Sequence, residues 1–372
     1  MTFSSVFEPV TQAARRHFAA SFAEARDGFV QAAGGAVRSY ATVSTGPDGS
    51  ELFTDCAWIG DPEARTVLVL ISGTHGIEGY SGSAVQRDWI AEHAAQWPHH
   101  APAVLLVHAL NPYGFAWDRR VTAEGCDLNR NFIDFANPPA NPDYSEIAEL
   151  LVPSSLDQSQ IERSEAELAR WRADKGELAF QIARKSGQCS DPKGMFYCGT
   201  SPAEAHRTLD RIFTDYRLME RDFVTVLDIH TGLGPYGYGE PQSEHDPASR
   251  SHAIAQDVIG PSLTSPELGT SFSVPLHGTM QQFWDQRIAD GRHLYLCLEF
   301  GTFDQESSRK LYREDHWYHG HGTGDPLSDY GLDLRRRMRA HFDPAEESWR
   351  EMVLVRTRQV IAQTLRHLDQ VR

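Results

Sequence analysis

The sequence predicts an α/β fold: a single three-layer α/β/α domain with a mixed, mostly parallel central sheet. Four apolar runs lack the polar–apolar alternation of a half-exposed strand, so both faces of each strand are expected to be covered. Helical patterns lie between these runs, and alternating strands and helices are typical of such a sheet. No linker rich in Gly, Ser or Pro divides residues 1–372 into two domains.

The elements follow in order along the chain. The predicted strands are residues 67–72, 103–109, 223–229 and 294–300, each rich in Val, Leu or Ile. The predicted helices are residues 81–97, 156–185, 202–221 and 346–368, the third of which opens with a proline, a common helix start. Residues 135–200 are expected to form an elaborated loop and helical insertion, and residues 304–344, rich in Gly, His and Tyr, an irregular segment.

Composition limits the partners. A net charge of -16 argues against nucleic acid and against an anionic membrane surface. No apolar stretch approaches ~20 residues, so no membrane span is expected, and the first residues lack the apolar core of a signal peptide. Five cysteines are few and odd in number, which favours a reducing cytoplasm with Cys189 and Cys198 as free thiols. The oligomeric state stays open.

His75 and Glu78 directly follow the first predicted strand, in the sequence His-Gly-Ile-Glu-Gly. A metal site needs an imidazole and a carboxylate that converge on one point, and the surrounding glycines would let the chain turn tightly enough. The alternative is that His75 caps a turn and Glu78 begins the next helix, where acidic residues are favoured. The position after a buried strand favours the metal site, because ligands of open α/β sheets bind at the carboxyl ends of strands.

A second group of polar residues follows the second strand, in the stretch RVTAEGCDLNRNF. Asn129 and Arg130 offer an amide and a guanidinium suited to a substrate carboxylate. Arg120 is a candidate for stabilising an oxyanion, and Asp127 for accepting a hydrogen bond from His75 and so setting its tautomer. A surface turn with solvated charges is the alternative, but it does not explain why so many of these groups occur together.

His230 and Glu299 stand at the ends of the third and fourth strands. His230 would supply the third protein ligand that an open catalytic zinc site requires, with Asp228 as its hydrogen-bond partner. Glu299 lies among Leu, Cys and Phe, where an unpaired carboxylate is costly. It is either one half of a buried ion pair or a general base of raised pKa beside the metal.

These residues resemble the M14 family of zinc carboxypeptidases, and more closely its bacterial DUF2817 branch, which is related to the aspartoacylase and succinylglutamate desuccinylase group. The resemblance covers about residues 67–302, and the stretch from Arg120 to Phe132 is similar to the motif of murein-peptide amidases. It implies one zinc ion per chain. It assigns His75, Glu78 and His230 as ligands, Glu299 and Arg120 as catalytic residues, and Asn129 and Arg130 as substrate-binding residues.

The resemblance implies a zinc-dependent hydrolase that cleaves an amide bond next to a free carboxylate, with a small peptide as substrate. Two alternatives stay open: an N-acyl-amino-acid deacylase of aspartoacylase type and a non-catalytic metal or carboxylate binder. Ile77 departs from the digestive enzymes, which carry an arginine at this position. The tyrosine that closes over the substrate in the family has no clear match, and Tyr236, Tyr238 and His277 are candidates for its role.

Overall fold

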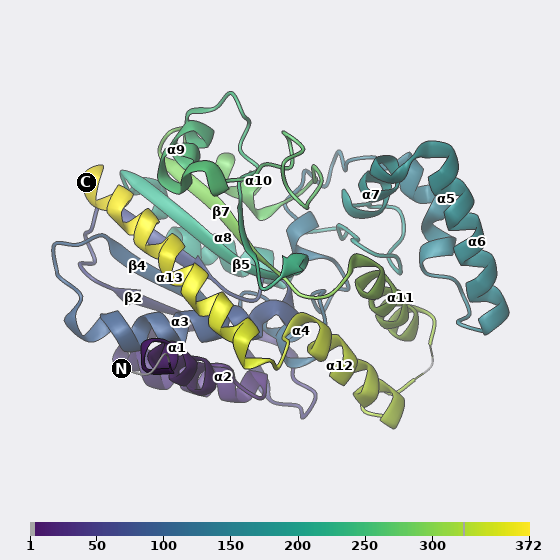
Figure 1. Cartoon of the computed structure of the whole chain (residues 1–372), viewed down its shortest axis with the longest axis horizontal. Coiled ribbons are helices and arrows are strands. Elements are labelled where there is room, and N and C mark those ends of the chain that lie inside the picture. Colours follow the sequence, from purple (N-terminus) through teal and green to yellow (C-terminus); the bar gives the residue numbers. More distant parts are fainter. Residues whose placement is uncertain (1–3, 323) are drawn as a thin grey trace.

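The computed structural model describes residues 4–322 and 324–372 of the chain (Figure 1). Its central sheet has seven strands in the order β1-β2-β4-β3-β5-β7-β6. The four central strands run parallel to one another, whereas β1, β2 and β6 pair antiparallel at the edges. The predicted mixed sheet with a parallel centre is confirmed. The strands are β1 Val37–Thr45, β2 Glu51–Ile59, β3 Thr66–Ile71, β4 Ala103–His108, β5 Phe223–Tyr236, β6 Gly239–Gln242 and β7 His293–Gly301.

Helices cover both faces of the sheet, because side chains on each central strand alternate between two apolar cores. Leu68 and Leu70 of β3 pack in the core beneath α1, α3, α9 and α13, whereas Val67 and Val69 pack in the core beneath α8 and α10. The helices are α1 Ser4–His17, α2 Phe22–Ala33, α3 Gly79–His93, α4 Pro112–Ala116, α5 Pro142–Leu151, α6 Gln158–Lys175, α7 Glu177–Lys185, α8 Glu204–Asp215, α9 Arg250–Ile259, α10 Met280–Asp285, α11 Gln305–Gly320, α12 Asp329–Phe342 and α13 Glu347–Gln370.

The insertion between β4 and β5 forms a helical lobe at one side of the molecule, where α5, α6 and α7 lie together (Figure 1). The helix predicted over residues 156–185 is divided into α6 and α7 at Gly176. Gly176 has φ +94°, which favours glycine and ends the first helix. A third apolar core joins α5–α7 to α11 and α12, so the lobe packs against the helices that follow β7.

The prediction of an irregular segment over residues 304–344 was wrong, because α11 and α12 occupy most of it. Both helices have side-chain caps. Asp304 accepts hydrogen bonds from the amides of Glu306 and Ser307, and Ser328 accepts one from Gly331. The composition rich in Gly, His and Tyr hid these helices, since their narrow buried faces include tyrosines and histidines alongside a few aliphatic residues.

The prediction of free thiols at Cys189 and Cys198 was also wrong, because the two form a disulfide. Backbone hydrogen bonds between Gln188 and the segment at residues 196–198 fold the chain back on itself and bring their Cα atoms to 5.1 Å. Cys56, Cys126 and Cys297 are free. Within the described part of the chain, we find no helix with the length and apolar character needed to span a bilayer.

Candidate active site

The turn after β3 carries His75 and Glu78 and is held by contacts with two other segments. A Cβ atom at Gly76 would lie 2.0 Å from the carbonyl carbon of Gly114, so only glycine fits there. The amides of Gly76 and Ile77 donate to the carbonyl oxygens of Arg120 and Arg119, at 3.2 and 2.9 Å. The turn therefore brings the His-Gly-Ile-Glu motif and the segment at Arg120 together.

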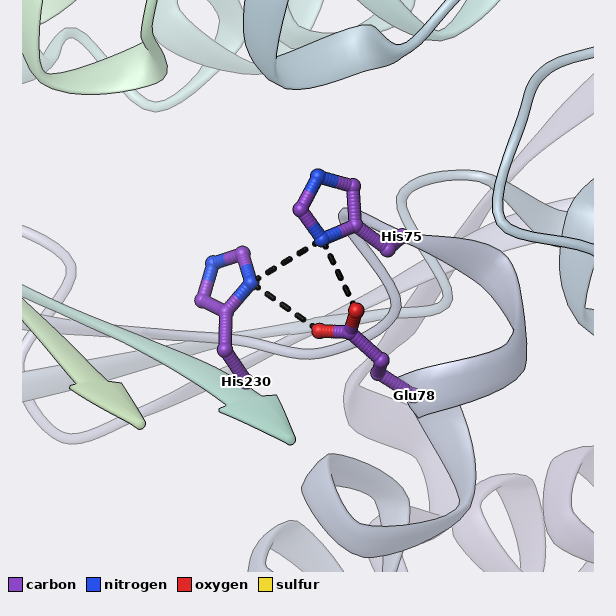
Figure 2. A group of neighbouring side chains, drawn as sticks. All are labelled: His75, Glu78 and His230. Atoms are coloured by element: carbon purple, nitrogen blue, oxygen red, sulfur yellow. Dashed lines mark hydrogen bonds and ion pairs between the residues drawn. The ribbon is translucent and has the colours of Figure 1, made fainter. Parts of the chain in front are cut away.

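His75, Glu78 and His230 converge on one point (Figure 2). Their ligand atoms form a triangle: His75 Nδ1 lies 3.0 Å from Glu78 Oε1 and 3.2 Å from His230 Nδ1, and His230 Nδ1 lies 3.1 Å from Glu78 Oε2. Bonds of about 2.0–2.1 Å in a tetrahedral zinc site separate ligand atoms by about 3.3 Å. The donor set and its spacing therefore fit a zinc ion with one position left for water or substrate.

Two buried aspartates orient the imidazoles. Asp228 Oδ2 lies 2.6 Å from His230 Nε2, and Asp127 Oδ1 lies 3.1 Å from His75 Nε2. A carboxylate accepts a hydrogen bond from the nitrogen that it faces, so Nε2 carries the hydrogen in each ring and the Nδ1 lone pairs point toward the shared centre. Arg120 Nη2 is also 2.7 Å from His75 Nε2. A nitrogen that donates to Asp127 has no lone pair for this guanidinium, so the second contact is not a hydrogen bond in this tautomer.

Arg120 lies beside the three candidate ligands and is buried. It donates from Nε to Asp127 Oδ2 at 2.9 Å and from Nη1 to Glu78 Oε1 at 2.9 Å and to the Tyr312 hydroxyl at 3.2 Å. Burial opposes ionisation of Glu78, but His75, His230 and Arg120 outweigh it and hold the pKa of Glu78 well below its usual range. The guanidinium thus lies directly beside the three candidate ligands.

Asn129 and Arg130 lie in the short helical turn Leu128–Arg130 and line the same pocket. The side-chain oxygen of Asn129 accepts a hydrogen bond from the amide of Met280 at 2.7 Å, which directs its amide nitrogen away from that contact. Arg130 donates to the carbonyl oxygens of Lys185 and Asn129 and stacks over Phe196 at 5.3 Å. These bonds use three of its five N–H groups, and two stay available for an anion.

Glu299 stands beside the candidate ligands because its position on β7 pairs with that of His230 on β5. Its Oε1 accepts a hydrogen bond from the amide of Leu233 at 3.1 Å. Burial, followed by the negative charge of Glu78, raises the pKa of Glu299 to about 8. A carboxylate with this environment, next to a candidate metal site, is a candidate for a general base.

The three candidate ligands line one pocket together with Arg120, Asn129, Arg130 and Glu299, whereas Asp127 and Asp228 lie behind it. The pocket also contains residues that sequence analysis missed: Arg184 and Lys185 of α7, Phe196, Glu244, and Gln305, Ser308 and Tyr312 of α11. No local pattern marks them, because they come from the insertion, from the segment after β6 and from α11, which was not predicted. The spacing of Gln305, Ser308 and Tyr312 along one helical face would have been a usable signal once α11 was assigned.

None of the three candidates for the capping tyrosine lines this pocket. Tyr236 is 40% exposed and its hydroxyl donates to Glu346, Tyr238 is 42% exposed, and the side chain of His277 is exposed. Tyr312 does line the pocket, and it contacts Arg120. It follows Glu299 in the chain, whereas the tyrosine of the resembled family precedes the glutamate, so the sequence order gave no reason to consider it.

Another group of possible ligands, which lies apart from His230, consists of His245, Asp285 and His293 and is less suited to a metal. The Nε2 atom of His245 accepts a hydrogen bond from the amide of Tyr295 at 3.0 Å, so its Nδ1 carries the proton and donates to Asp285 at 3.0 Å. His293 Nε2 also faces Asp285, at 2.8 Å. With one imidazole committed to two hydrogen bonds, this group forms a structural network around the carboxylate.

A family model described as "Protein of unknown function (DUF2817)" matches residues 18–356. The carboxypeptidase A from Helicoverpa armigera aligns over 86% of this chain and 73% of its own, with 13% identity and a TM-score of 0.41. The murein-tripeptide amidase MpaA from Escherichia coli O157 aligns over 78% of this chain and 94% of its own, with 17% identity and a TM-score of 0.36. A metallo-carboxypeptidase from Pseudomonas aeruginosa aligns over 90% of this chain and 68% of its own, with 13% identity and a TM-score of 0.39. No curated protein matches. At these similarities the structural matches do not define the activity of the chain.

Proposed function

The chain belongs to the DUF2817 family, and from the geometry of its site we propose a zinc-dependent hydrolase that cleaves an amide bond next to a free carboxylate. The observation that carries this proposal is the triangle formed by His75, Glu78 and His230, with Glu299 beside it. Three N/O ligands with an open fourth position are typical of catalytic rather than structural zinc sites. A buried carboxylate with a raised pKa would have no purpose in a site that only binds metal.

The chemistry divides among the residues of the pocket. A zinc ion bound there would lower the pKa of water toward ~7 and polarise the scissile carbonyl. Glu299 takes the proton from the attacking water and later returns it to the leaving amine. Arg120 donates N–H groups to the oxygen on which negative charge develops. Asp127 keeps that guanidinium in place through its bond to Nε.

Substrate position follows from the second pair of residues. Arg130 and the amide nitrogen of Asn129 bind the free carboxylate of the substrate, which determines the amide bond that lies over the metal ligands. Among the described residues Arg130 forms no ion pair, so its charge is available for this role. Substrates in which this carboxylate is converted to an amide should lose most of their activity.

Glu299→Gln tests the proposal. The variant keeps the shape and the hydrogen bond from the amide of Leu233 but cannot accept the proton of water, so we expect kcat to fall ~10²–10⁴-fold with zinc still bound. Zinc content and kcat are measured on the same preparation. A variant that retains zinc and near-normal turnover would show that another residue is the base.

An N-acyl-amino-acid deacylase is a second candidate, supported by one contact at the pocket wall. The Nζ atom of Lys185 donates to Gln305 Oε1 at 2.7 Å, which joins the insertion to α11 and favours a short acyl group. A panel of peptides with varied C-terminal residues and of N-acyl amino acids with the same residues separates the two activities. Preference for long peptides would support the carboxypeptidase, and preference for short acyl groups the deacylase.

A further inference from the structure

Three cations line the pocket without an ion-pair partner among residues 4–322 and 324–372: Arg130, Arg184 and Lys185. Arg130 has a role in the proposed function, but the other two do not. The acids nearest to Arg184 are already paired, Glu177 with Arg172 and Glu306 with Arg309. In a chain with a net charge of -16, two neighbouring cations left unpaired at a pocket call for an explanation.

Burial makes these cations costly. Arg184 is only 4% exposed, its Nε has no hydrogen-bond partner in the described structure, and its one hydrogen bond is from Nη2 to Gln181 at 2.9 Å. The Nζ of Lys185 has three N–H groups and uses one of them, for Gln305. Burial lowers the pKa of Lys185 to about 7 and that of Arg184 to about 10. A bound anion would remove this cost, as a partner does for any buried charge.

Among the described residues, no acid of the pocket forms an ion pair with Arg184 or Lys185. The charge of Glu299 opposes the fall in the pKa of Lys185, but Glu299 is also the proposed base. Glu244 lies just after β6, and burial raises its pKa, with Arg130 the pocket cation that offsets this rise. A second anion on a substrate would be attracted to the wall formed by α7, where Arg184 and Lys185 lie.

We propose that Arg184 and Lys185 form a second anion subsite, which binds a carboxylate of the substrate other than the one held by Arg130. The substrate is then a diacid amide, whose second carboxylate belongs either to the acyl group or to the side chain of the leaving amino acid. This inference rests on the proposed function, since it concerns the same pocket. It adds the requirement that the substrate carry a second negative charge, which neither the zinc site nor the pair Asn129 and Arg130 imposes.

Four compounds distinguish the two sources of the second carboxylate. N-succinyl-leucine and N-butyryl-leucine differ by an acid on the acyl group, and N-butyryl-glutamate and N-butyryl-glutamine differ by an acid on the leaving amino acid. Binding is measured by calorimetry with the zinc-loaded Glu299→Gln protein, so the result does not depend on turnover. We expect the diacid of one pair to bind about tenfold or more tightly than its neutral partner, as is typical of a charge-assisted contact.

Variants connect this preference to the two residues. Lys185→Met and Arg184→Gln, each combined with Glu299→Gln, should reduce the preference for the diacid to less than about threefold, and Lys185→Arg should retain it. Arg170→Gln is the matched control, because Arg170 lies on the neighbouring helix α6 and is exposed. Lys185→Met provides a second test if Arg184→Gln does not fold.

Equal binding within both pairs by the parent protein, or a preference for the diacid that survives in Lys185→Met, would overturn the subsite. Activity of the wild-type protein is measured separately on the same four compounds and on peptides. If the protein hydrolyses none of them, the proposed function fails, while the binding comparison still decides the subsite. If it hydrolyses them without regard to the second acid, the proposed function stands and the subsite does not.

Discussion

Asp228→Asn should weaken zinc binding without unfolding the protein. Asp228 is fully buried, and it accepts hydrogen bonds from the Tyr295 hydroxyl at 2.8 Å and the Thr74 hydroxyl at 2.8 Å as well as from His230 Nε2 at 2.6 Å. Asparagine can keep its oxygen toward His230 and turn its amide nitrogen toward the Thr74 hydroxyl, which can also accept a hydrogen bond. The change therefore removes a negative charge behind the imidazole while leaving a partner for each neighbour.

The magnitude follows from what this charge does. A carboxylate behind a metal-bound imidazole orients the ring and raises its basicity, and losing such a partner typically costs 10–100-fold in metal affinity, or ~1.4–2.7 kcal/mol. Competition with a chelator of known affinity gives the zinc dissociation constant, and circular dichroism checks the fold. Tyr295→Phe is the control, because it removes another donor to the same oxygen and leaves the carboxylate, so its effect should be clearly smaller. A folded Asp228→Asn protein that binds zinc as tightly as the wild type would refute this role of Asp228.

Two further predictions concern the substrate and the stability of the fold. Arg130→Ala should raise KM, because Arg130 contacts the substrate carboxylate both before and during the reaction. Arg120→Ala should lower kcat by ~10²-fold, because the oxyanion that Arg120 stabilises forms only in the transition state. If steady-state kinetics on one substrate showed the reverse, both assignments would be wrong. Burial lowers the pKa of His108 to about 3. The unfolded chain, with a histidine pKa of about 6.5, therefore binds more protons below that pH, and stability falls as the pH drops from 6.5 toward 3, by ~2 kcal/mol at pH 5 from this group. His108→Gln keeps a hydrogen-bond partner for Ser83. The free energy of unfolding in urea should therefore fall less between pH 7 and pH 5 in this variant than in the wild type. An equal fall in the two proteins would contradict the role given to His108.

The sequence predicted the centre of the sheet better than its edges for a physical reason. The central strands are covered on both faces and so appear as unbroken apolar runs. In β1 only Tyr40 is buried, and β6 is a short edge strand that contains Pro241, so neither has such a run. Asp304 and Ser328 are N-cap residues that mark the starts of α11 and α12 in the sequence. A prediction based on the composition of the segment did not use them.

The residues of the candidate site also divide into those that the sequence predicted and those that it did not. His75, Glu78, Asp127, Asp228 and His230 belong to motifs at strand ends, and the predicted contacts among them are present in the structure. Arg184, Lys185 and Tyr312 reach the pocket from helices that only the packing of the insertion brings near, so no local pattern could place them.

The prediction that Cys189 and Cys198 are free thiols failed because the folding of the insertion brings them together. The expectation of a reducing compartment rested partly on Cys189 and Cys198 being unpaired. The chain folds back between them and joins them in a disulfide. That part of the support for a cytoplasmic location is therefore removed.

The central claim is that one zinc ion is bound by His75, Glu78 and His230. Anomalous diffraction at the zinc absorption edge, from crystals of protein prepared with excess zinc, tests this claim most directly. We predict a single strong peak within about 2.0–2.2 Å of His75 Nδ1, His230 Nδ1 and an oxygen of Glu78. No peak at this point, or a peak only at His245, Asp285 and His293, would contradict the account.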